Sequence, residues 1–201
     1  MVKRCILYSA GGFGVRIISG ECGGRKLITL DGRDTRPTAD KVKESLFNIL
    51  APYIGGGEAV LDLFAGSGAL GLECLSRGAE SAVFIEKSKS AAQIVKKNIS
   101  ALGYEAKSRV ILSDFEKYLA QCHEQFDFVF IDPPYASGFY GTSLKLIKSN
   151  GLLKQGGLIV LECGSETEMP DISGYSVIKV RNYKTSTITI LKDKEDTNGN
   201  I

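Results

Sequence analysis

The chain has 201 residues, of which 43% are hydrophobic and 24% are charged, as in an ordinary soluble domain. This composition excludes a collagen-like chain, a disordered chain and an integral membrane protein. The formal net charge is only +2, but residues 1–43 carry nine Lys and Arg against four Asp and Glu, and the other 158 carry sixteen against nineteen. A basic N-terminal part indicates either a polyanion partner or a merely solvated surface, and charge alone leaves both open.

The N-terminal residues predict an extension and a hairpin. Residues 1–14 end in a Gly-rich stretch without periodicity, so we expect them to be disordered. Two β-prone runs, residues 16–19 and 25–30, flank a second Gly-rich stretch. This pattern predicts a small basic β-hairpin within residues 15–36.

From residue 37 to 192 the sequence alternates between apolar runs and helical stripes, which predicts one α/β domain. Strands are expected over residues 59–63, 81–85, 109–112, 126–131, 156–161, 175–181 and 186–191. Helices are expected from Thr38 to the residue before Pro52, over residues 69–77, around residues 92–102, and over residues 115–121 and 140–149. The fold class is therefore a mostly parallel sheet of seven strands, with helices on both faces and an antiparallel C-terminal strand. Residues 193–201 are polar and are expected to form a flexible tail.

The first strand of this domain runs directly into a glycine-rich turn. Gly66, Gly68 and Gly71 follow Asp62 with the G-x-G-x-x-G spacing of dinucleotide-binding loops. The glycines allow backbone to approach a ligand, and the next helix offers unpaired N–H groups. The spacing alone is weak evidence, because glycines at an ordinary turn give the same pattern.

Acidic residues end the next two strands. Glu86 lies twenty residues after Gly66, where a carboxylate can accept both hydroxyls of a ribose. The alternative is a surface Glu beside Lys87. Asp114 follows Ser113 at the end of the third strand, where it could accept from an adenine amino group or only cap the following helix. The sequence leaves both pairs of alternatives open.

The fourth strand ends in the most specific motif, Asp132-Pro133-Pro134-Tyr135. Two prolines stop the strand and remove two N–H donors. Carbonyl oxygens and the Asp132 carboxylate are then the polar groups at the strand end, and they suit a substrate that presents an NH₂ group. Tyr135 offers a flat face on which a base can stack.

These motifs resemble known methyltransferases. Val60–Gly68, taken together with Asp132–Tyr135, is similar to the class I S-adenosylmethionine-dependent enzymes that modify exocyclic amino groups. The resemblance implies a Rossmann-like fold.

A closer resemblance, to the RsmD family, rests on residues 16–20, 24–27, 36–38 and 43–50. Members of that family methylate N2 of a guanosine in 16S ribosomal RNA. The resemblance covers about residues 15–192, nearly the whole chain. It implies an enzyme that acts on 16S rRNA, within a small ribosomal subunit or an assembly intermediate. The scattered cysteines and the lack of a signal-peptide pattern in residues 1–10 predict a cytoplasmic protein, and no obligate protein partner is evident from the sequence.

The resemblance also implies three groups of site residues. S-adenosylmethionine would contact Arg36, Thr38, Asp62, Phe64, Ala65, Gly66, Ser67, Gly68, Glu86, Lys87, Ser113 and Asp114. The catalytic residues around the acceptor amino group would be Asp132, Pro133, Pro134 and Tyr135. The phosphates of the RNA would contact Arg16, Arg25 and Lys26.

Other functions and a metal site are less well supported. The cysteines number five, without a Cys-x-x-Cys pair, and there is one histidine, so we expect reduced thiols and no metal centre. A DNA amino-methyltransferase shares the Asp-Pro-Pro-aromatic ending, but this chain leaves no room for a target-recognition domain. A non-catalytic RNA-binding factor would not need an intact cofactor pocket. An NAD(P) oxidoreductase has no use for Asp-Pro-Pro-Tyr, and cofactor binding would distinguish it.

Overall fold

The computed structural model describes residues 15–30, 37–133 and 138–197. The expected extension over residues 1–14 lies outside these ranges, as do Arg36, Pro134 and Tyr135. Thr38 belongs to the first helix, but its side chain is not described.

Seven strands form one mixed sheet in the order β3-β2-β1-β4-β5-β7-β6. The strands are β1 (Ala59–Asp62), β2 (Ser81–Glu86), β3 (Ser108–Leu112), β4 (Phe126–Ile131), β5 (Leu153–Gly164), β6 (Tyr175–Asn182) and β7 (Ser186–Asp193). Strands β1 to β5 run parallel to one another, whereas β7 is antiparallel to both β5 and β6. The mostly parallel sheet with an antiparallel C-terminal strand is thus confirmed.

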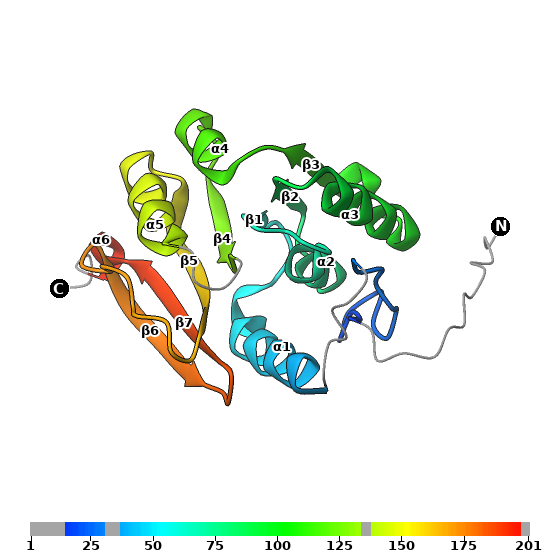
Figure 1. The fold of residues 1–201 in the computed structure, drawn as a ribbon, viewed down its shortest axis with the longest axis horizontal. Coiled ribbons are helices and arrows are strands. Elements are labelled where there is room, and N and C mark those ends of the chain that lie inside the picture. Colours follow the sequence, from blue (N-terminus) through cyan, green and yellow to red (C-terminus); the bar gives the residue numbers. More distant parts are fainter. Residues whose placement is uncertain (1–14, 31–36, 134–137, 198–201) are drawn as a thin grey trace.

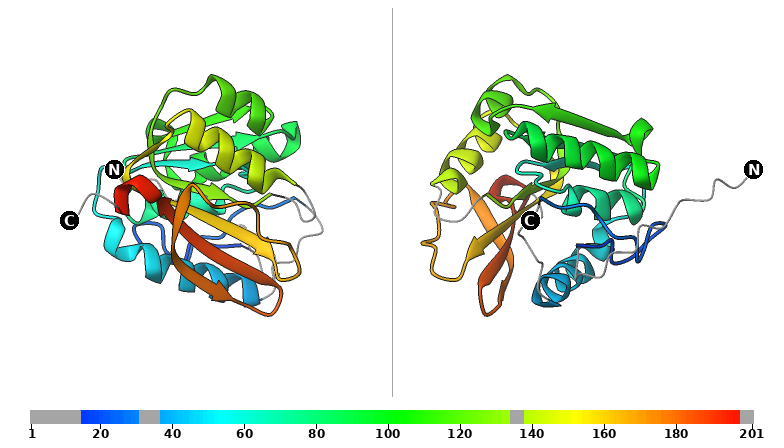
Figure 2. Two further views of the ribbon diagram at one scale, coloured as in Figure 1. Left: turned by 90° about the vertical axis from the view of Figure 1, so that its left-hand side faces the viewer. Right: turned by 45° about the vertical axis from the view of Figure 1, so that its right-hand side comes forward.

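Helices cover both faces of the sheet (Figures 1 and 2). They are α1 (Pro37–Leu50), α2 (Ala69–Ser76), α3 (Lys89–Leu102), α4 (Phe115–Gln121), α5 (Phe139–Ser149) and α6 (Lys194–Thr197), with short 3-10 turns at Ala51–Tyr53 and Glu105–Lys107. Side chains alternate between the faces of a strand. Val60, Phe84 and Phe130 therefore pack in one core with α1, α2 and α3, whereas Leu61 and Ile85 pack in a second core with α4 and α5. None of the described helices is long and apolar enough to cross a membrane.

The predicted N-terminal β-hairpin is present only as a short antiparallel pairing. In residues 15–30, which we call the N-terminal segment, one antiparallel bridge, between Arg16 and Lys26, and cross-chain backbone hydrogen bonds from the N–H groups of Ile17, Gly24 and Leu27 join the two halves, which form no extended strands. Other backbone donors bind side chains of the domain. The N–H groups of Ile18 and Ser19 donate to the Glu73 carboxylate at 2.7 and 3.0 Å. Backbone donors that are already satisfied in this way do not extend a ladder.

Two C-terminal features differ from expectation. β5, expected over residues 156–161, runs from Leu153 to Gly164 and so continues past the end of β4. Beyond Asp193, where a flexible tail was expected, α6 forms the next four residues. Lys148 pairs with Asp193 at 2.6 Å, and the Gly156 N–H donates to Asp196 at 2.8 Å. These contacts hold residues 193–196 against α5 and β5.

Candidate active site

Three predicted site residues meet at one edge of the sheet. Glu86 ends β2, Asp62 ends β1, and Asp132 follows β4 directly. These strands are parallel neighbours in the order β2-β1-β4, so their carboxyl ends lie together. In open α/β sheets this edge is where ligands bind.

The turn between β1 and α2 places backbone at that edge. Gly66 and Gly68 have φ values of +56° and +80°, which glycine adopts without strain. A Cβ on Gly68 would also lie 3.2 Å from Val95 Cγ1. Gly71 serves packing instead, because a Cβ there would lie 2.5 Å from Phe84 Cε1. The first two glycines shape the turn, and the third lets α2 lie close to β2.

Asp62 is a buried carboxyl group, with 3% of its surface exposed. Its Oδ2 accepts from the Gly71 N–H, in the first turn of α2, at 3.2 Å. Burial raises its pKa to about 7; the Gly71 hydrogen bond opposes this rise, and the nearby charge of Glu86 adds to it. A group in this position favours a ligand that brings a positive charge.

Glu86 ties the end of β2 to the glycine turn. Its Oε2 accepts from the Gly66 N–H at 2.9 Å, and its Oε1 accepts from the Ser88 N–H at 2.7 Å. Each carboxylate oxygen can accept a second hydrogen bond. Glu86 is therefore held in place and still has acceptor capacity for ligand hydroxyls. The contact with Gly66 argues against an ordinary surface residue.

Asp114 is the N-cap of α4, which is one of the two roles that the sequence left open for it. Its Oδ1 accepts from the Glu116 N–H at 3.0 Å, and its Oδ2 pairs with Lys87 Nζ at 2.8 Å. The hydrogen bond from Lys87 lowers the pKa of Asp114. The Ser113 hydroxyl donates to the Asp114 carbonyl at 3.0 Å. A contact between Asp114 and adenine stays a prediction.

An aromatic cluster lies beside the glycine turn, and of its three members only Phe64 was expected at the site. The Phe64 ring stacks on Phe139 with centroids 6.0 Å apart, and Phe115 lies 5.1 and 5.0 Å from these two rings. The three residues come from the turn after β1 and the first positions of α4 and α5. They supply apolar surface next to the turn. Their only common sequence signal is a Phe just after a strand end or at a helix start.

The acceptor end of the site is described only in part. Asp132 is exposed and Pro133 is buried. Pro134 and Tyr135 lie outside the described residues, and so does Arg36. The structure therefore brings Asp62, Glu86 and Asp132 to one edge and leaves those three residues as predictions.

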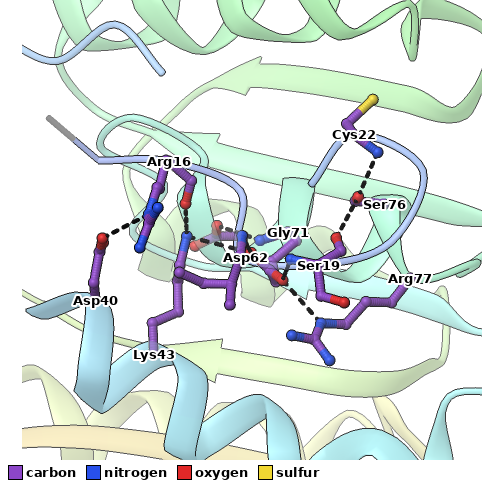
Figure 3. A network of polar contacts seen from close by, with 11 residues as sticks. Arg16, Ser19, Cys22, Asp40, Lys43, Asp62, Gly71, Ser76 and Arg77 are labelled. Carbon is purple, nitrogen blue, oxygen red and sulfur yellow. Dashed lines mark hydrogen bonds and ion pairs between the residues drawn. The ribbon is translucent and has the colours of Figure 1, made fainter. Parts of the chain in front are cut away.

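The N-terminal segment is fixed to α2 by a buried polar network (Figure 3). Glu73, fully buried on α2, holds the backbone of the segment and pairs with Lys43 at 3.3 Å and Arg77 at 2.8 Å. The Lys43 ammonium also donates to the Arg16 carbonyl. Ser76 donates to the Ser19 carbonyl at 2.6 Å. The available signal was that Glu73 is the one charged residue of α2.

A second buried side chain joins the segment to the glycine turn. Asn98 on α3 is 1% exposed. Its Nδ2 donates to the carbonyls of Ser67 and Ile28, both at 2.9 Å, and its Oδ1 accepts from the Ile28 N–H at 2.8 Å. Asn98 therefore links the N-terminal segment to the turn that shapes the site.

The three basic residues expected to contact RNA are exposed. Arg16 pairs with Asp40 at 2.9 Å, and Arg25 donates to the Ala101 carbonyl at 3.3 Å. They lie on a segment packed against α2 and α3, not on a projecting arm.

Comparisons with known proteins agree with this geometry. The family model described as Conserved hypothetical protein 95 matches residues 15–192. Ribosomal RNA small subunit methyltransferase D of Escherichia coli K12 is 42% identical over 158 residues, which are 79% of each chain. The protein of that name from Haemophilus influenzae is 39% identical over 169 residues, covering 82% of this chain and 86% of its own length. The solved structure of E. coli yhhF has a TM-score of 0.80 at 36% identity, covering 89% of this chain and 97% of that one.

Proposed function

This chain belongs to the family described as Conserved hypothetical protein 95, the RsmD family, and we propose that it is an S-adenosylmethionine-dependent methyltransferase of small-subunit ribosomal RNA. The relatives named as small-subunit rRNA methyltransferases support the substrate class. The observation that carries the proposal is the meeting of the glycine turn, Glu86 and Asp132 at one edge of the sheet.

The residues at the cofactor end fit S-adenosylmethionine. Glu86, held by the Gly66 and Ser88 N–H groups, would accept hydrogen bonds from the ribose hydroxyls. Asp62 is a buried carboxyl without a cation against it in its described surroundings, so it suits the positively charged methionine part. The cluster of Phe64, Phe115 and Phe139 supplies apolar surface beside the turn. The bound molecule would supply a methyl group on a positively charged sulfur. Because the sulfur would leave as a neutral sulfide, its departure needs no acid.

The finer proposal is that the acceptor is N2 of a guanosine in 16S rRNA. An aromatic amine is a weak nucleophile because its lone pair is delocalised into the ring. Asp132 and the Pro133 carbonyl would each accept an N2–H hydrogen bond, which orients the nitrogen and favours a pyramidal geometry. The rest of the rate would come from alignment, to which a rigid strand end contributes. The exposed Arg16, Arg25 and Lys26 would contact RNA phosphates.

The test uses radiolabelled S-adenosylmethionine with small ribosomal subunits from a strain that lacks this gene, beside wild-type subunits and duplex DNA. We expect label only in the rRNA of the deletion strain, released on digestion as N2-methylguanosine. Label in DNA would favour a DNA amino-methyltransferase, and no label in any sample would overturn the proposal.

Two variants separate the two ends of the site. Asp132→Ala should abolish transfer and leave the dissociation constant of S-adenosylhomocysteine within a few-fold. Glu86→Ala should weaken that binding, because the ribose loses its acceptor. Loss of transfer and binding together in Asp132→Ala would mean that Asp132 is structural.

A further inference from the structure

Glu162 stands beside Asp132 on the neighbouring strand. The parallel register of β4 and β5 pairs Ile131 with Leu161, so the next residues, Asp132 and Glu162, come level with each other. Neighbouring strands lie about 4.8 Å apart. β5 continues to Gly164 and pairs Glu162 with Ile188 of β7, so the backbone at Glu162 is held from the far side.

The two carboxylates share a face of the sheet. Phe128 and Phe130 of β4 and Leu158 and Val160 of β5 all pack in the core under α1, α2 and α3. Because side chains alternate along a strand, the face that carries Val160 also carries Glu162. The same argument applied to Phe130 places Asp132 on that face. Asp132 and Glu162 thus come two residues beyond the last core residues on this face, Phe130 and Val160.

The charges of both carboxylates act on the same two neighbouring groups. Burial above all raises the pKa values of the Tyr140 phenol and the Cys163 thiol, and the charges of Asp132 and Glu162 add to both rises. The Tyr140 hydroxyl donates to the Glu162 carbonyl at 2.9 Å, which fastens this strand end to α5. Burial also raises the pKa of Glu162 itself, and a hydrogen bond with Ser186 opposes that rise. Glu162 is half-buried, with its partner Ser186 on one side.

Guanine differs from the other amino-bearing bases at one ring atom next to its amino group. The guanine C2 that carries the amino group lies between N3, which has a lone pair, and N1, which carries a hydrogen. In adenine and cytosine the ring nitrogen beside the amino group has a lone pair instead. A carboxylate placed beside the residues that hold the amino group would therefore accept a hydrogen bond from the N1–H of guanine. It would repel the ring-nitrogen lone pair of adenine or cytosine.

We propose that Glu162 accepts the hydrogen bond from guanine N1–H and thereby selects guanine as the methyl acceptor. This inference rests on the proposed function, in which Asp132 and Pro133 hold the amino group. Sites built to hydrogen-bond one substrate reject an analogue that leaves their buried polar groups unpaired. Glu162 would add this discrimination to an Asp-Pro-Pro motif that by itself suits any exocyclic amine.

The test replaces the target guanosine with 2-aminopurine, which keeps the amino group at C2 but has a lone pair at N1. The target position is first mapped with the wild-type enzyme, and the analogue is placed there by ligation of synthetic RNA. We expect the wild type to prefer guanosine by roughly 10- to 100-fold in kcat/KM. Glu162→Gln, whose amide can donate to N1, should lose most activity on guanosine and gain activity on 2-aminopurine.

Three outcomes separate the possibilities. Equal wild-type rates on the two bases would overturn the role of Glu162 and leave the methyltransferase function standing. So would a Glu162→Gln variant that binds S-adenosylhomocysteine normally but loses both activities in equal proportion. Absence of wild-type transfer to guanosine would overturn the proposed function and this inference with it. Glu80→Gln, the same charge change at an exposed residue before β2, should match the wild type.

Discussion

Replacement of Asp62 by Asn should change the pH dependence of stability in a characteristic direction. Burial raises the pKa of Asp62 from 3.8 to about 7, so the folded state holds this proton more tightly than the unfolded state does. The contribution of Asp62 to the free energy of unfolding is therefore fully present below about pH 4 and is lost as the pH rises through 7. At 1.36 kcal/mol for each pH unit, the loss approaches about 4 kcal/mol above pH 7.

Asn cannot ionise, so the variant avoids that loss. Its Oδ1 can still accept from the Gly71 N–H, as Asp62 Oδ2 does at 3.2 Å. Its NH₂ group would be buried without a hydrogen-bond acceptor, which would lower the free energy of unfolding by about 1–3 kcal/mol at every pH. We therefore expect Asp62→Asn to be less stable than wild type at pH 4.5 and more stable at pH 8.5.

Urea unfolding followed by far-UV circular dichroism at a series of pH values measures this difference. Asp114→Asn is the matched control, because the hydrogen bond from Lys87 lowers the pKa of Asp114. Its ionised form stabilises the fold, so that variant should be less stable than wild type at neutral pH, and the difference should shrink as pH falls. A free-energy difference between wild type and Asp62→Asn that stays constant from pH 4.5 to 8.5 would refute the assignment of the raised pKa.

Two further predictions concern the N-terminal segment. Asn98→Leu removes the three hydrogen bonds by which Asn98 joins Ile28 to Ser67 in the glycine turn, and leaves three partly buried backbone groups unpaired. It should cost about 3 kcal/mol or more in urea unfolding and weaken S-adenosylhomocysteine binding, and unchanged binding would show that the turn keeps its shape without Asn98. Reversing Arg25 and Lys26 to Glu should reduce rRNA affinity and flatten the slope of its salt dependence by about one for each phosphate that is no longer neutralised, and an unaltered slope would place the RNA surface elsewhere.

Much of the sheet could be predicted from the sequence because its strands are nearly continuous apolar runs. Phe126–Ile131 and Ser81–Glu86 are recognisable in this way, and each ends in or is followed by an acidic residue. A parallel sheet brings such ends to one edge whatever the details of packing. Asp62, Glu86 and Asp132 could therefore be assigned to one site before any contact was known.

Glu162 directly follows the apolar run that ends at Leu161, so the same reasoning could place it at this edge of the sheet, but the sequence does not show that it still belongs to β5. The true end depends on β7, whose Ile188 pairs with Glu162. Register between segments distant in sequence is not encoded in either segment alone.

The antiparallel pairing in the N-terminal segment is shorter than predicted, for a physical reason that also lies outside the segment. Its β-prone residues favoured a hairpin, but the backbone donors of Ile18 and Ser19 bind the buried Glu73 carboxylate. That arrangement makes α2 a shared element, because its first turn binds Asp62 through Gly71 and its middle holds the basic segment. A surface proposed to bind RNA is thereby built on the same helix as the proposed cofactor turn. Because α2 is only eight residues long, the contacts with the N-terminal segment and the contact with Asp62 lie within about two helical turns of each other.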